Sequence, residues 1–552
     1  MKKLLLALVS LVFAATAQAQ WQSTTYTLKG GWNSIYLHGD ASYATLDAIF
    51  ASQTAVQEVW RWNPNPTQVQ FTTSPLIPSA GTAEWSTWVR GGSANSLGQM
   101  IGQSAYLVKC SGLSSNSYSV TIPQKVMPPS ATWVRNGANL MGFPSKLTGT
   151  YPSMSSYFAT FPAAIASNVK IYKYVGGDLG PGNPLQVFST SSEKLDRNQS
   201  YWFDTKVVGS FYAPVEISLS NGSGIDFGRT GSTVTVRLLN RSATVSTVTI
   251  APVVSSNAPT GQEDITGAVP ITRRVFNAST ASWTETPIDA AFTEVVGPNA
   301  AVELTFGIDR TAMTGSSNAF YASLLRLTDS ANLYDILLPV TARKASLAGL
   351  WIGDAVVGGV QSKTAGYTGT ATAQTYNLRY IVHVDDAGNA RVLSQVYLGQ
   401  LAGATPQSGI CTVESALSVA DKASARRIVA AHLPLDRVLD GGTMALGGSL
   451  SCTISTPFND PTSPFVHQYH PDHDNKSGTT PLVSGQESYD LSRAVTFAIS
   501  AAAPAGVSAT GYGASVIAGD YTEVLTGLRK DSITVTGTFT LRRVSEIGIL
   551  TR

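Results

Sequence analysis

The chain has 552 residues, of which 43% are hydrophobic and 13% charged, and its formal net charge is +2. At roughly 100–200 residues per domain, this length predicts about three to five domains. The sparse charge excludes a strongly basic nucleic-acid binder, and with abundant Thr, Val and Ser it favours a mainly β, multidomain protein over long exposed helices.

The first 19 residues have the features of a signal peptide. Lys2 and Lys3 form a positive start, Leu4–Ala15 is an apolar run, and Ala17–Ala19 offers a small-x-small cleavage site. The alternative, an N-terminal anchor helix, is disfavoured because the run is too short to span a bilayer. No later stretch approaches ~18 uninterrupted apolar residues, so we expect no transmembrane span. The sequence therefore predicts export to the periplasm, the cell surface or the medium.

Two similar segments follow, at 20–122 and 123–213. Equivalent pieces keep the same order although the insertions between them differ in length, which indicates two copies of one β-rich unit. Within each copy, aromatic and basic residues alternate with the period of a strand that has one aromatic face. The matching pieces are Gly31-Trp32-Asn33, Trp60-Arg61-Trp62 and Ala105–Val108 in the first copy, and Gly137-Ala138-Asn139, Tyr172-Lys173-Tyr174 and Ser200–Phe203 in the second.

This pattern resembles a module of secreted bacterial surface proteins in which a "GWN" strand precedes a "W-x-W" strand and a closing "AYWV"-type strand. The resemblance covers about residues 22–212 and implies export and surface display rather than catalysis; the second copy departs from it at Ala138. Aromatic side chains at strand spacing either form a core or offer a platform on which sugar rings stack. The six candidates are Trp32, Trp60, Trp62, Tyr172, Tyr174 and Trp202.

Residues 214–345 read as a β-sandwich. Alternating runs such as Thr233–Asn240 and Asp335–Thr341 are separated by turn residues. The progression from Asp226-Phe227-Gly228 through these runs resembles the Ig-like domains of the abnormal-spindle/Hydin type. That resemblance implies a role in spacing or in protein contact.

Residues 346–552 are predicted to form an antiparallel β-barrel or sandwich. Arg379–Val384 and Ala390–Ser394 flank a turn at 385–389, which is typical of a hairpin. The Gly-x-Trp opening at Gly349 loosely resembles small-ligand barrels of the calycin kind, which implies an apolar ligand inside. The spacing of apolar residues over Ala420–Asp440 predicts an inserted helix.

One segment of this region gathers metal-ligating residue types. Three of the six histidines fall within seven residues, and two carboxylates and an amide lie beside them. Imidazoles favour Zn²⁺ and oxygen donors favour Ca²⁺, while a plain polar loop is the alternative. The candidate ligands are His467, His470, His473, Asp472, Asp474 and Asn475.

The chain has three cysteines. Cys411 and Cys452 lie in one predicted domain and are candidates for a disulfide in an exported protein, with Cys110 left as a lone thiol. The alternative is three free thiols.

No common catalytic motif is present in the sequence. We therefore expect an exported, non-enzymatic β protein that acts in surface display, adhesion or matrix and envelope contact, with a protein or glycan partner. The alternatives are a secreted carbohydrate-binding or carbohydrate-active protein, and a carrier of a small apolar ligand.

Overall fold

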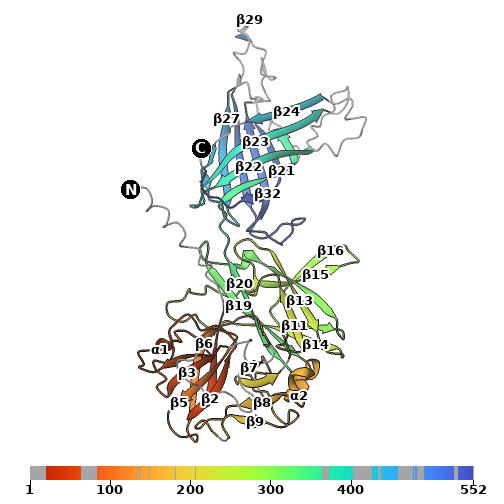
Figure 1. The fold of residues 1–552 in the computed structure, drawn as a ribbon. Helices are drawn as coiled ribbons and strands as arrows, with labels where there is room; N and C mark the ends of the chain where they lie inside the picture. Colours follow the sequence, from red (N-terminus) through yellow and green to blue (C-terminus); the bar gives the residue numbers. More distant parts are fainter. Residues whose placement is uncertain are drawn as a thin grey trace, which may run out of the picture. The chain divides into compact units, whose positions relative to one another are not determined.

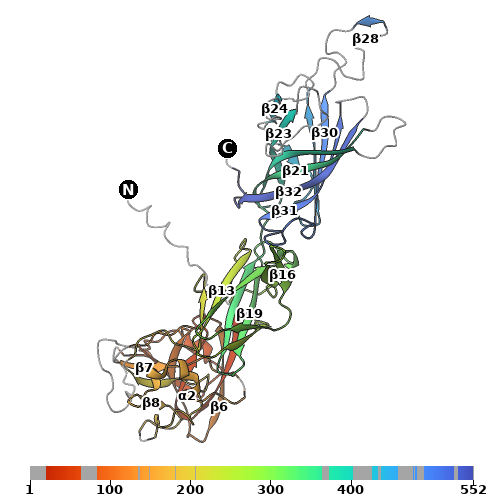
Figure 2. The ribbon, with the colours of Figure 1, turned by 90° about the vertical axis from the view of Figure 1, so that its right-hand side faces the viewer.

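The structure is a computed structural model that describes residues 20–550 apart from 64–83, 135–136, 148, 181, 206, 363–371, 402–425, 433–436, 458–475, 478, 482–489 and 528–531. The chain divides into two compact units, Met1–Ile308 with Ala319–Arg343 and Asp309–Asn318 with Lys344–Arg552. Strands dominate both (Figures 1 and 2). The expected mainly β, multidomain fold is confirmed.

The predicted signal peptide at 1–19 lies outside the described residues. Within the described ranges, no helix is both long and apolar enough to cross a membrane.

The two similar segments fold into four-stranded sheets with the same strand order. In each sheet the strand that comes first in the sequence pairs with the strand that comes last. The last strand also pairs with the second, and the second pairs with the third. This shared topology is what a duplicated unit predicts. The strands in sheet order are β2 (Gly31–Leu37), β5 (Ser104–Cys110), β3 (Val56–Trp62) and β4 (Trp85–Val89) in the first sheet, and β7 (Gly137–Met141), β10 (Tyr201–Thr205), β8 (Lys170–Lys173) and β9 (Leu185–Val187) in the second.

Local contacts repeat between the two copies as well. Asn33 binds both the N–H and the C=O of Lys29, at 2.9 and 2.8 Å. Its counterpart Asn139 binds both backbone groups of Val134, at 2.7 and 3.0 Å. The Asn of the Gly-x-Asn motif thus holds the chain that precedes the first strand, because one amide satisfies a backbone donor and an acceptor together.

Short helices and a separate ribbon complete this part of the first unit. The hydroxyls of Thr45 and Ser153 accept hydrogen bonds from the backbone at equivalent helix starts, as N-cap residues do. The elements are α1 (Leu46–Ile49), α2 (Met154–Tyr157), the 3₁₀ turns η1 (Phe158–Thr160) and η2 (Pro162–Ile165), and the antiparallel pair β1 (Trp21–Lys29) and β6 (Ser117–Lys125).

Two five-stranded sheets follow, as in a β-sandwich. Strand β13 of the first buries alternate residues, whereas β19 and β20 of the second are buried along most of their length. In sheet order, the first contains β11 (Val215–Leu219), β13 (Thr233–Asn240), β18 (Ala301–Ile308), β15 (Ile271–Asn277) and β16 (Ser282–Pro287). The second contains β12 (Ile225–Asp226), β20 (Asp335–Arg343), β19 (Phe320–Asp329), β14 (Ser246–Val253) and β17 (Phe292–Val296).

The second unit is a nearly closed antiparallel barrel built as a meander. Strand β32 pairs with β21 in the middle of the sheet. At the two ends of the sheet, β25 pairs with β23 and the following strand β26 pairs with β27, so the two ends meet. The elements are η3 (Arg310–Ala312), β21 (Gly349–Ser362), β22 (Thr372–Val384), β23 (Ala390–Leu401), β24 (Arg426–His432), β25 (Arg437–Leu439), β26 (Gly441–Gly442), β27 (Ser449–Thr456), β28 (Lys476–Ser477), β29 (Thr480–Pro481), β30 (Leu491–Ile499), β31 (Val516–Thr526) and β32 (Ile533–Ser545).

The predicted helix over Ala420–Asp440 is wrong where the structure describes that range. Residues Arg426–His432 form strand β24, which pairs antiparallel with Gln395–Leu401 of β23. The alanines favoured a helix, but β23 extends past β25 and offers a free edge, and pairing with that edge overrides the local preference.

Candidate functional site

The six aromatic side chains singled out as stacking candidates lie together in one buried cluster. Each is at most 8% exposed, and the rings pack edge to face; the centroids of Trp62 and Trp202 lie 5.0 Å apart. The cluster forms where the two repeat sheets meet, since β2–β5 and β7, β8 and β10 contribute to it. In this structure the rings form a core, which is one of the two interpretations of the pattern, and they do not form a platform.

Two indole N–H groups of the cluster have acceptors within it. Trp62 donates to the Ala138 carbonyl at 3.3 Å, and Trp202 donates to the Tyr174 hydroxyl at 3.2 Å. Burial raises the pKa of Tyr174 far above its ordinary value, so this hydroxyl keeps its proton. A buried aromatic contact with its polar atoms paired stabilises the joint between the repeats.

Two clefts, of about 310 and 250 Å³, flank this cluster. The larger runs along β1 and is lined mainly by polar groups, including Lys29, Lys173 and Asp196. Tyr174 lines the larger cleft and Trp62 lines the smaller cleft, but both side chains are at least 95% buried. The clefts therefore expose polar edges rather than ring faces.

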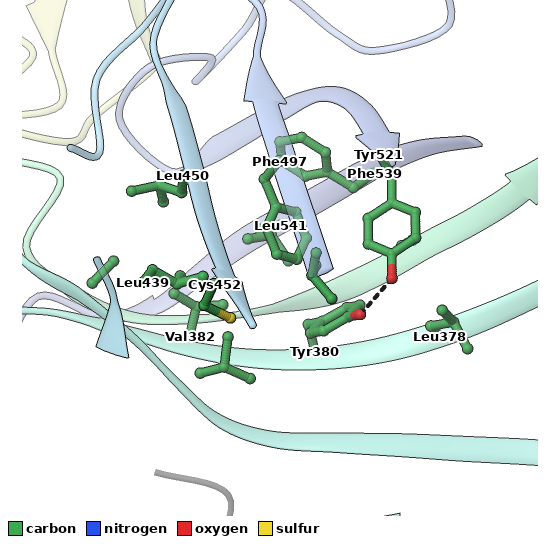
Figure 3. Packing of buried hydrophobic residues seen from close by; sticks show 14 of the residues in the cluster. Leu378, Tyr380, Val382, Leu439, Leu450, Cys452, Phe497, Tyr521, Phe539 and Leu541 are labelled. Atoms are coloured by element: carbon green, nitrogen blue, oxygen red, sulfur yellow. Dashed lines mark hydrogen bonds between the residues drawn. The ribbon is translucent and has the colours of Figure 1, made fainter. Parts of the chain in front are cut away.

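Aromatic rings pack together inside the barrel (Figure 3). Phe497 packs 5.0 Å from Tyr380, 5.5 Å from Tyr521 and 5.1 Å from Phe539, measured between centroids. These side chains point inward because alternate residues of β22, β30 and β31 face the axis.

A polar network crosses this interior. The hydroxyls of Tyr380 and Tyr521 lie 2.7 Å apart, and Tyr521 donates to Glu523 at 2.5 Å. Arg493 forms an ion pair with Glu523, and both residues are 2% exposed. Burial raises the pKa of Tyr380 well above its ordinary value. The network neutralises its own charges, which suits a structural role.

The Gly-x-Trp motif lies at the start of β21, near one end of the barrel. The Trp351 ring is fully buried, its N–H donates to the Leu347 carbonyl at 2.8 Å, and the Arg543 guanidinium lies 5.4 Å from the ring centroid. The long connections leave from the other end, because the paired ends Thr456 and Leu491 lie there.

The candidate metal ligands, His467, His470, His473, Asp472, Asp474 and Asn475, all lie outside the described residues. Zn²⁺ or Ca²⁺ binding there stays a prediction. Among the residues that the structure does describe, no group of three or more His, Cys, Asp or Glu side chains is placed to hold a metal.

The cysteines whose surroundings are described are buried thiols. Cys110 and Cys452 are both free, and burial raises the pKa of each to about 11, so neither is a reactive thiolate at neutral pH. Cys452 faces the barrel interior (Figure 3). Cys411 lies outside the described residues, and the predicted bridge to Cys452 has no support in the structure.

The sequence analysis missed an exposed aromatic pair. All ten tryptophans are described; nine are at most 8% exposed, whereas Trp283 is 49% exposed and neighbours Phe276, which is 50% exposed. Phe276 belongs to β15 and Trp283 to β16, the two strands of the hairpin labelled in Figure 1, and their ring centroids lie 5.2 Å apart. The sequence contains a signal for this exposure: apart from Trp283, all residues from Asn277 to Thr284 are small or polar.

No family model matches the chain, and a search of curated proteins found no match. Among solved structures, a DUF4466 family protein from Parabacteroides merdae ATCC 43184 is 8% identical, with 60% of this chain and 99% of that one covered and a TM-score of 0.17. A structural-genomics protein of unknown function from Bacteroides ovatus is 10% identical, with coverages of 61% and 97% and a TM-score of 0.12. At such TM-scores the likeness assigns neither a family nor a function to the chain.

Proposed function

We propose that the chain is an exported, non-enzymatic protein of tandem β-domains that acts by contact at the bacterial cell surface, in the matrix or in the envelope. The observation that carries this proposal is the exposed pair Phe276 and Trp283, in a chain that buries its other nine tryptophans. Aromatic side chains are enriched where proteins meet partners, and β-sheets hold them in place at little entropic cost. The sandwich bearing them supports the Ig-like reading of residues 214–345, which also stays a proposal.

A sedimentation experiment tests the proposal. The purified chain is mixed with isolated envelopes of the producing organism and centrifuged. We expect the wild type in the pellet and the double variant Phe276→Ala/Trp283→Ala in the supernatant. Phe188→Ala serves as the control, because Phe188 is 84% exposed and lies outside the hairpin. Equal sedimentation of the double variant and the wild type would contradict the role of the pair, and a wild type that stays in the supernatant would contradict envelope contact.

The barrel favours a second candidate function, the carriage of a small apolar ligand. A barrel whose interior carries a large cluster of apolar residues is a shape that holds such ligands. The rings of Tyr380, Phe497 and Phe539 belong to that cluster, so any ligand would have to displace them or lie beyond them. A fluorescent fatty-acid probe tests this candidate. Binding of the probe to the wild type that is abolished in Phe497→Trp supports the candidate. No enhancement of the probe's fluorescence by the wild type opposes it.

A further inference from the structure

The outer half of the β15–β16 hairpin has no neighbour in its own sheet except its partner strand. Strand β15 pairs with β18 only through Ile271–Arg274, whereas it pairs with β16 through Thr272–Asn277. From Val275 onward the hairpin therefore extends past β18, and β16 is the edge of the sheet. Side chains on this extension stay exposed because no third strand flanks them.

One face of the extension carries an ordered row of side chains. Phe276 and Trp283 are directly opposite each other across the two strands, as are Arg274 and Glu285. The Arg274 guanidinium lies 4.6 Å from the Trp283 ring centroid, and its Nε lies 3.4 Å from Glu285 Oε1. The indole is thus oriented by a cation–π contact with Arg274 and by contact with the Phe276 ring.

The base of the hairpin is fixed to the rest of the sandwich. Arg273, on the opposite face, donates to Glu294 Oε2 at 2.7 Å and lies 4.5 Å from the centroid of the Phe292 ring. Both partners belong to β17 in the other sheet. A row of rings on an anchored hairpin is preorganised, which lowers the entropic cost of binding a ligand.

We propose that this row is a binding platform for a neutral polysaccharide, with Trp283 and Phe276 stacking on sugar rings. The proposal rests on the contact function proposed above and names its ligand class. Three features select a neutral, hydroxyl-rich polymer. The surface is an open hairpin rather than a pocket that would enclose a small apolar molecule. The Arg274 charge is paired with Glu285, so the platform carries no net charge of its own.

The third feature is the rim of the platform. The turn that joins the two strands is exposed and carries hydroxyl side chains able to bind sugar hydroxyls, at Ser279 and Thr280. Asn277, Ser282 and Thr284 alternate with the rings along the strands and therefore lie on the other face of the hairpin. An apolar protein partner would instead favour an apolar rim around the rings.

The experiment uses the full chain and soluble polysaccharide probes in affinity gel electrophoresis. The neutral probes are a glucan, a mannan and a galactan, and alginate is the acidic comparison. We expect at least one neutral probe to retard the wild type and Trp283→Ala to weaken that binding roughly tenfold. Trp283→Phe should retain part of the binding, and Phe188→Ala should behave as the wild type.

A second readout follows Trp283 itself. Because the other nine tryptophans are buried, a bound neutral polysaccharide should protect the chain's fluorescence from acrylamide. Absence of retardation by every neutral probe, or equal retardation of Trp283→Ala, would overturn the proposal. Preferential binding of alginate, or dimerisation that Trp283→Ala abolishes, would also overturn it, in favour of an acidic ligand or a second copy. Envelope sedimentation that persists while all neutral probes fail would refute the ligand class and leave the contact function standing.

Discussion

Aromatic residues occur on neighbouring strands in two regions of this chain and reach opposite environments. On β3, Trp60 and Trp62 are 6% and 5% exposed and pack into the cluster between the two repeat sheets. On the β15–β16 hairpin, Phe276 and Trp283 are each about half exposed. Residue type and strand period are similar in the two regions, so neither determines burial.

The difference lies in what covers each strand. The second repeat sheet lies over the face of β3 that carries the tryptophans, whereas the outer half of the hairpin extends past β18. Strand period decides which residues share a face, and the neighbouring layer decides whether that face is core or surface. Five substitutions test this difference between the two regions.

The largest effect is expected from truncation inside the cluster. Trp202 is fully buried and packs against both Trp62 and Trp85. We expect Trp202→Ala to lower the free energy of unfolding of the first unit by about 3–5 kcal/mol, because it leaves a cavity at the joint between the repeats. Urea denaturation measures this. A loss below about 1 kcal/mol would mean that the cluster is not a core.

The next effect concerns the repeated asparagine. Asn33 and Asn139 make the same pair of backbone hydrogen bonds in their two copies. We expect Asn33→Ala and Asn139→Ala each to cost about 1 kcal/mol, because each leaves a partly buried backbone donor and acceptor without their amide partner. Denaturation curves of the two variants should be similar. A large loss in one copy and none in the other would contradict their equivalence.

A pH effect should follow from His38, whose ring packs 4.9 Å from Tyr36 at the edge of the cluster. Burial, with the nearby Arg197 charge, holds the pKa of His38 well below its ordinary value. The imidazole is neutral in the folded chain, and the unfolded chain takes up a proton below about pH 6.5. Stability should therefore fall as the pH drops below that value, by at most about 1.4 kcal/mol per pH unit.

His38→Gln isolates this contribution, since Gln retains a donor for the Arg197 carbonyl that His38 contacts at 2.8 Å. The free-energy difference between wild type and variant should change between pH 7.5 and pH 5.0. A difference that is constant with pH would show that His38 does not titrate between the folded and unfolded states.

The smallest effect is expected at the exposed pair. Trp283→Ala removes one cation–π contact and one ring contact at a solvent-accessible site, so we expect a loss of about 1 kcal/mol or less. The same denaturation assay measures it beside Trp202→Ala. A loss as large as that of Trp202→Ala would mean that Trp283 also belongs to a core.

Much of the fold could be predicted from the sequence where strands alternate. The hairpin expected from Arg379–Val384 and Ala390–Ser394 is present, and the alternate residues Tyr380, Val382 and Val384 are buried inside the barrel. The helix expected over Ala420–Asp440 failed because the free edge of β23, a tertiary feature, pairs with Arg426–His432. Local propensity does not contain that information.

The candidate site was harder to predict. The sequence places Trp60 and Trp62 on one strand face but does not show the second sheet that covers them. It likewise does not show that β15 continues beyond its last contact with β18, which is why Trp283 was missed. Whether a ring is exposed depends on where each strand ends relative to its neighbours, and such offsets arise only in the assembled sheet.

Of the ten tryptophans, Trp283 alone is available for contact, and acrylamide quenching of intrinsic fluorescence measures this availability. We expect a strongly quenched component in the folded wild type that disappears in Trp283→Phe, leaving emission that acrylamide barely reaches. Quenching of equal strength in the wild type and in Trp283→Phe would contradict it, since a tryptophan of the cluster between the repeats would then have to be exposed.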